Sequence, residues 1–97
     1  MRWVALFDDT PKMADVRKRA HAEHVAYLAA HSTEILIAGG LHSEPGLPLA
    51  GGLWVMEAAN RDEAVRLVEN DPYFVPGIRT YRLFQWGKSL EGRPVVL

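Results

Sequence analysis

The sequence predicts an α+β domain with the element order βαββαβ, and three observations predict it. Four short segments rich in apolar, β-branched or aromatic residues are typical of strands, at residues 2–8, 34–41, 53–58 and 78–86. Two segments with helical periodicity lie between them, one after Thr10 and one after Asn60. At 97 residues, 48% of them hydrophobic, the chain has the size and composition of one globular domain, residues 1–97. This order is the ferredoxin-like arrangement, a sandwich in which a four-stranded antiparallel sheet carries two helices on one face.

The first two predicted strands differ in their sequence patterns. In residues 2–8 both faces are largely apolar, which predicts a strand buried on both sides. Residues 34–41, EILIAGGL, end in two glycines, where a backbone turns sharply or approaches another group closely. The connection HSEPGLPLAGG at residues 42–52 is long for a segment without regular structure, and such loops are often functional.

Both helices have residues typical of a helix start. Thr10 and Pro11 fit the N-cap and the first turn of the first helix. Asn60, followed three positions later by Glu63, gives a capping-box pattern for the second helix.

The first helix carries ionisable residues on a face that is expected to be buried. Its apolar arc consists of Met13, Val16, Ala20, Tyr27 and Leu28. Arg17, His24 and His31 fall inside the same arc. Such a stripe is unusual for an ordinary amphipathic helix, so these residues are candidates for a site.

The second face of the sheet has no helix to cover it. Large apolar residues are expected to point out from it: Trp3 or Val4, Trp54 or Val55, and Phe84 or Trp86. A chain this short has a thin core, and without cysteine no disulfide can support it. We therefore expect a homodimer that packs sheet against sheet, and assembly beyond a dimer stays open.

Charge and hydropathy exclude several classes of partner. Eleven Lys and Arg against twelve Asp and Glu give a net charge of -1 without a basic run, so nucleic acid is not an expected partner. The N-terminus lacks a signal-peptide core, and no apolar stretch is long enough for a transmembrane helix. A cytoplasmic location away from membranes is the default expectation.

His24 and Asp71 are the candidates for acid and base chemistry, and each also has a purely structural interpretation. His24 can be a hydrogen-bonded histidine at the core edge, or a general base that a carboxylate orients. Asp71 stands before Pro72 in ENDPYFVPG, where its pattern favours capping a short turn. Spacing alone does not connect the two residues.

The sequence gives less support to a metal site, a serine nucleophile or a dinucleotide-binding loop. His21 and His24 are three apart rather than in the zincin spacing, and there is no nucleophile elbow or dinucleotide loop. No metal or cofactor is therefore expected.

Several segments in this order resemble the YciI-like, or YCII-related, family. They are an N-terminal strand, a helix with His24 before YLAAH, a strand ending in AGGL, a capped second helix, and NDPY leading into GI and a last strand. The most specific elements are His24 and DPY at residues 71–73, with support from Gly39. The resemblance covers residues 2 to about 86.

The resemblance implies a fold that forms a dimeric α/β barrel, with His24 and Asp71 meeting in a pocket as a catalytic pair. The family includes enzymes similar to dehydrochlorinases and to muconolactone-isomerase relatives, which act on small cyclic compounds, often derived from aromatics. Where the family often has a basic residue three places before the histidine, this chain has His21, with Arg17 or Arg19 as the alternative. The expected substrate-binding residues are Arg17, His21, Gly39, Gly40 and Tyr73.

Two hypotheses about function follow. The first is an enzyme in which a His-Asp pair moves a proton on a small molecule, in a metal-free elimination, isomerisation or hydrolysis. The second is a module without catalysis that binds a metabolite or another protein on the same dimeric scaffold. A cofactor-free monooxygenase on this type of barrel lacks a motif here.

Overall fold

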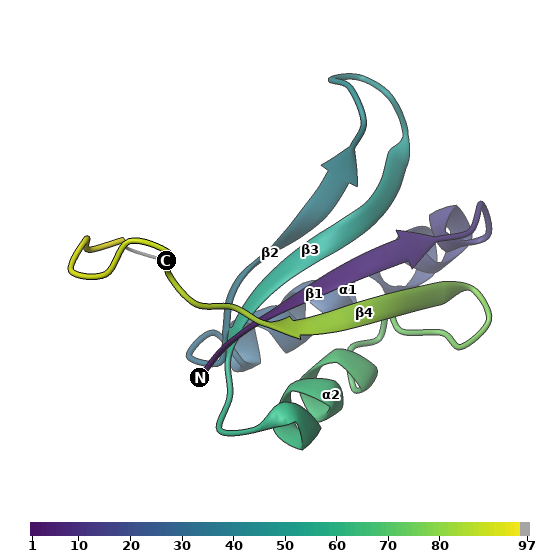
Figure 1. Ribbon diagram of the computed structural model, residues 1–97. Helices are drawn as coiled ribbons and strands as arrows, with labels where there is room; N and C mark the ends of the chain where they lie inside the picture. The colour runs from purple at the N-terminus through teal and green to yellow at the C-terminus, as the bar shows by residue number, and fades with distance from the viewer. Residues whose placement is uncertain (96–97) are drawn as a thin grey trace.

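The computed structural model describes residues 1–95, and its elements follow the order β1, α1, β2, β3, α2, β4 (Figure 1). Their bounds are β1 Arg2–Asp9, α1 Met13–Ala30, β2 Ile35–His42, β3 Leu49–Glu57, α2 Arg61–Glu69 and β4 Arg79–Gln85. The strands form one antiparallel sheet in the order β2-β3-β1-β4. Figure 1 shows both helices on the same side of this sheet, so the predicted α+β, ferredoxin-like fold is confirmed.

The core lies between the sheet and the helices. Strand β1 contributes Trp3, Ala5 and Phe7, because alternate residues of a strand share one face. Apolar residues of the other strands and of α2 pack on them: Ile35, Trp54, Met56, Ala64, Leu67, Val68 and Leu83. The expectation that β1 is buried on both faces is only half right, since Val4 and Leu6 are partly exposed on the open face.

Helix α2 begins as its sequence predicts. The side chain of Asn60 accepts a hydrogen bond from the backbone N–H of Glu63 at 2.9 Å. The Glu63 carboxylate in turn accepts from the N–H of Ala59, one residue before the position that a capping box uses.

The predicted start of α1 is wrong by two residues. Lys12, not Thr10, is the N-cap, and it makes no side-chain cap hydrogen bond. The backbone carbonyl of Thr10 instead accepts from the N–H of Met13 at 3.0 Å, so residues 10–12 form a turn before the helix. Backbone groups satisfy the first N–H groups, and no side-chain cap is needed.

The connection before β3 is shorter than predicted. β2 continues to His42 and β3 begins at Leu49, so residues 43–48 join the strands as a hairpin. Gly51 and Gly52 therefore lie inside β3, opposite Asp8 and Phe7 of β1. Proline and glycine suggested a loop here, but pairing with β2 from Leu49 and with β1 from Gly51 extends the strand.

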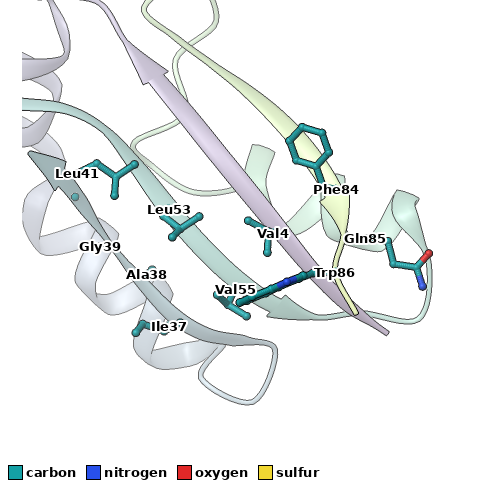
Figure 2. Close-up of a pocket in the computed structure, with 11 residues that line it drawn as sticks. Val4, Ile37, Ala38, Gly39, Leu41, Leu53, Val55, Phe84, Gln85 and Trp86 are labelled. Carbon is teal, nitrogen blue, oxygen red and sulfur yellow. The ribbon is translucent and has the colours of Figure 1, made fainter. Parts of the chain in front are cut away.

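The face of the sheet opposite the helices carries an apolar groove of about 600 Å³. Figure 2 shows side chains from all four strands around it, with the Trp86 ring directed back toward Val55. Ile37, Phe84 and Trp86 are each about half exposed there. Within residues 1–95, no helix combines the length and the apolar character that crossing a membrane requires.

Gly51→Ala should destabilise the protein by about 1–3 kcal/mol in urea unfolding. A Cβ at this position would overlap the backbone carbonyl oxygen of Phe7, which cannot move without disturbing the pairing of β1 with β3. Gly87→Ala is the control, because a Cβ there meets no atom within 4 Å. Equal unfolding free energies for the two variants would contradict this account of Gly51.

Candidate active site

Asp71 and His24 come together although 47 residues separate them in the chain. Nδ1 of His24 lies 2.7 Å from Oδ1 of Asp71. The Asp71 side chain is only 1% exposed and that of His24 is 13% exposed. A short contact of this kind, away from bulk water, holds the imidazole in one orientation.

The turn after α2 places the Asp71 carboxylate. Oδ1 of Asp71 accepts the backbone N–H of Tyr73 at 3.2 Å, and the Asp71 carbonyl accepts that of Phe74 at 2.8 Å. Pro72 has no N–H, so the helix cannot continue through it. The structural interpretation of Asp71 therefore holds together with the contact to His24, because one carboxylate oxygen serves both.

The contact with Asp71 decides which nitrogen of His24 is available for chemistry. An ionised carboxylate only accepts hydrogen bonds, so Nδ1 carries the proton that it donates, and Nε2 has a free lone pair. Within residues 1–95, every fully buried side-chain nitrogen or oxygen has a partner, and Nε2 of His24 has none. Nε2 is therefore accessible, and His24 lines a cavity between α1 and the sheet.

Tyr73 supports His24 from one side. Its ring stacks on the imidazole with centroids 3.7 Å apart and planes 5° from parallel. Its hydroxyl and Nδ1 of His21 share a hydrogen bond at 3.1 Å. Burial raises the pKa of the Tyr73 phenol; the charges of Arg17 and Arg79 oppose the rise, and the Asp71 charge adds to it. The phenol therefore stays protonated near neutral pH.

The cavity has a volume of about 360 Å³, which lies within the range of small-molecule sites. It is lined by Arg17, His21, His24, Val25, Leu28, Gly39, Gly40, His42, Leu49, Gly52, Trp54, Tyr73 and Arg79. All the substrate-binding residues expected from the sequence are among them, whereas Asp71 lies behind His24 and does not line the cavity. Asp71 can therefore act only through His24.

Gly39 and Gly40 of β2 line both this cavity and the groove on the open face of the sheet. This part of β2 therefore separates the cavity from the groove. Gly40 pairs with Gly52 on the cavity side, and a Cβ at Gly40 would overlap the Leu49 side chain. A Cβ at Gly39 would meet nothing within 4 Å. The absence of side chains keeps this end of the cavity open.

Two charged residues of the site were missed from the sequence, Asp9 and Arg79. They face each other in the register of β1 with β4. Nε and Nη2 of Arg79 donate to the Asp9 carboxylate at 2.6 and 3.2 Å, and Nη2 of Arg17 donates to it at 2.5 Å. Burial by itself would raise the pKa of Asp9, but hydrogen bonds and charges from Arg79 and Arg17 outweigh it and lower that pKa.

His31, the third member of the predicted stripe, lies outside the site. Its ring bonds to Glu34 at 3.1 Å and contacts the ring of Tyr27. Among residues 1–95, no three His, Asp or Glu side chains form a group that could bind a metal ion. His42, which the sequence did not single out as a site residue, lines the cavity instead.

Asp9→Asn should lower the free energy of unfolding by about 3–5 kcal/mol at neutral pH, because it leaves the buried Arg79 guanidinium without its countercharge. The folded-state pKa of Asp9 is depressed, so its contribution is complete above about pH 4 and is lost as the pH falls through the lower folded-state pKa. Urea titrations of both proteins at several pH values measure this difference.

The control for this prediction is Asp8→Asn, the exposed neighbour whose contact with Arg82 is 3.9 Å long. It should change stability by less than about 0.5 kcal/mol. If the difference in free energy of unfolding between wild type and Asp9→Asn stayed constant down to pH 2, the assigned role of the carboxylate would be wrong.

Comparisons with known proteins agree with this fold. Among solved structures, the chain is similar to 5-chloro-2-hydroxyhydroquinone dehydrochlorinase from Burkholderia phenoliruptrix AC1100, solved as a complex with 2,5-dihydroxybenzoquinone. The TM-score is 0.76 at 29% identity, over 90% of this chain and 94% of the other. A search of curated proteins gives no match. The family model for the YCII-related domain matches residues 1–87, and the chain therefore belongs to the YCII-related family.

Proposed function

We propose that the protein is an enzyme in which His24 transfers protons on a small cyclic compound, with Asp71 as the residue that orients it. The observation that carries the proposal is the 2.7 Å contact between the two side chains at the wall of a small cavity. The carboxylate fixes the tautomer and the orientation of the ring, so Nε2 is the nitrogen that can take and give a proton. A general base so placed contributes roughly 10²- to 10⁴-fold in rate.

Elimination of HCl is the reaction class that we favour over isomerisation and hydrolysis. The similar dehydrochlorinase is named for a chlorinated hydroquinone. In such a compound a hydroxyl proton is lost and the chlorine-bearing carbon gains one. Loss of a second hydroxyl proton then lets chloride leave with the electron pair of the C–Cl bond. The net change is loss of HCl, and both steps are proton transfers that one imidazole can perform.

We also propose that the enzyme is a homodimer through the open face of the sheet. The groove there is lined mostly by apolar residues, with Gln85 as the one polar side chain among its described residues, and its lining includes half-exposed Ile37, Phe84 and Trp86. A second copy offers the same surface, so a two-fold interface would cover both grooves at once. Because Gly39 and Gly40 border both groove and cavity, such an interface would lie next to the site.

His24→Ala should abolish chloride release from 5-chloro-2-hydroxyhydroquinone in protein that stays folded, with a lowered Tm because the buried Asp71 carboxylate loses its histidine partner. His31→Ala is the matched control at the C-cap of the same helix, outside the cavity, and should keep full activity. Activity that survives intact in His24→Ala would eliminate His24 as the base. Tight binding of 2,5-dihydroxybenzoquinone without turnover of any chlorinated hydroquinone would favour the binding module.

Asp71→Asn keeps the side-chain oxygen that accepts the Tyr73 N–H but removes the negative charge beside His24. We expect a loss of kcat/KM within the range of roughly 10²- to 10⁴-fold, because an amide no longer fixes the tautomer of the imidazole. A purely structural role would lower the Tm and leave kcat/KM of the folded protein unchanged.

Phe84→Glu should convert the dimer to a monomer, because a carboxylate would be buried in an apolar interface. Light scattering coupled to size exclusion measures the mass. Leu47→Glu, at an equally exposed apolar position in the β2–β3 hairpin, should leave the mass unchanged. A wild-type protein that is monomeric at micromolar concentration would rule out the dimer.

A further inference from the structure

The cavity contains an excess of positive charge that the proton-transfer proposal does not use. Arg17 and Arg79 both donate to the single carboxylate of Asp9. Two guanidinium charges and one carboxylate charge leave one positive charge. Guanidinium groups stay protonated at any physiological pH, and the pKa of Asp9 is lowered, so this balance holds across the neutral range.

The positive side of this cluster faces the cavity. Arg17 and Arg79 line it, whereas Asp9 does not and has a side chain that is only 2% exposed. Within residues 1–95, Arg79 donates to protein through Nε and Nη2, and Arg17 through Nη2 alone. The remaining N–H groups of both residues donate to no protein group, and Arg17, with 19% of its side chain exposed against 4% for Arg79, is the more accessible to a ligand. Asp9 holds the two guanidinium groups in place.

A glycine keeps the approach to Arg79 clear. Gly52 of β3 borders the cavity, and a Cβ there would lie 3.4 Å from Nη2 of Arg79 and 3.2 Å from the carbonyl oxygen of Gly39. A side chain at this position would cover the guanidinium. Much of the remaining wall is apolar, formed by Val25, Leu28, Leu49 and Trp54, so a charge contact inside it is poorly screened.

Arg17, at the positive end of the cavity, and His24, the proposed base, lie along one face of helix α1. Arg17, His21 and His24 follow at positions i, i+4 and i+7 of α1, which share one helical face. Arg17 and His24 are therefore about 10.5 Å apart along the axis, at 1.5 Å per residue. A ligand that contacts both side chains within about 360 Å³ has the size of a single substituted ring.

We propose that the site selects ring compounds that carry an anionic oxygen, a phenolate, enolate or carboxylate, which Arg17 and Arg79 bind while His24 faces the opposite end of the ring. This assignment rests on the proposed function of the same cavity and adds the charge of its substrate. Asp9 acts as a positioning residue that keeps the two guanidinium groups together at one end.

Isothermal titration with two matched pairs of probes tests the charge preference without requiring turnover. The first pair is 2,5-dihydroxybenzoquinone, whose hydroxyl ionises readily because conjugated carbonyls share the charge, and its neutral relative 2,5-dimethoxybenzoquinone. The second pair is benzoate and benzamide, which have nearly the same shape. The first anion reports on an enolate oxygen and the second on a carboxylate.

Arg17→Met should weaken binding of the preferred anion by about 10- to 100-fold, the range for a charge-assisted hydrogen bond, and change binding of its neutral partner less than about 3-fold. Arg19→Met removes the same charge from an exposed position on the same helix and should change neither. Asp9 keeps its two bonds to Arg79 in Arg17→Met, so the Tm should fall only slightly.

The result that overturns the inference is equal affinity for an anion and its neutral partner in both pairs, no binding of either anion, or an equal loss for Arg17→Met and Arg19→Met. A wild-type protein that prefers one anion, loses the preference in Arg17→Met and turns over no substrate would support the anion site and refute the proposed catalysis. Turnover without any preference for an anion would support the proposed catalysis and refute the anion site.

Discussion

The inner face of α1 both packs on the sheet and forms a wall of the cavity, and this constraint shapes the rest of the molecule. Only Met13 and Val16 of its residues are buried. Further along the same face come Arg17, His21 and His24, which line the cavity. Polar groups removed from water need partners, since an unpaired one costs free energy. Other elements supply these partners: Asp9 from β1, and Asp71 and Tyr73 from the turn after α2.

The turn after α2 shows how one short segment can meet a folding requirement and a chemical one together. The Asp71 carboxylate satisfies the N–H of Tyr73, which would otherwise be unpaired beyond the helix end. The same oxygen accepts the hydrogen bond from Nδ1 of His24. Tyr73 then covers one face of that ring and reaches His21 with its hydroxyl. In the proposed mechanism a rigid corner is useful, because small displacements of a general base have large effects on rate.

Two buried carboxylates organise the polar side chains of the cavity in groups of different composition. At one end a single carboxylate holds two guanidinium groups, and at the other a single carboxylate holds one imidazole. Both carboxylates lie outside the lining, so a ligand would meet the positive or neutral partners. In the proposed reaction His24 would gain a proton and become a second positive centre, and an anionic ligand would be stabilised between the two.

The sequence by itself determined the order of the elements, the capped start of α2 and the apolar character of both sheet faces, because these follow from local periodicity and turn chemistry. It also marked His24 and Asp71 as candidates, although their pairing was expected only through a family resemblance. The tertiary structure alone decided that β3 begins at Leu49, since pairing with His42 of β2, and with β1 from Gly51 onward, overrides the glycines and prolines there. It alone revealed Asp9 and Arg79, which lie 70 residues apart and meet only through the register of β1 with β4. Contacts between residues so far apart leave no local pattern, because strand register sets them and it forms only when the whole sheet does.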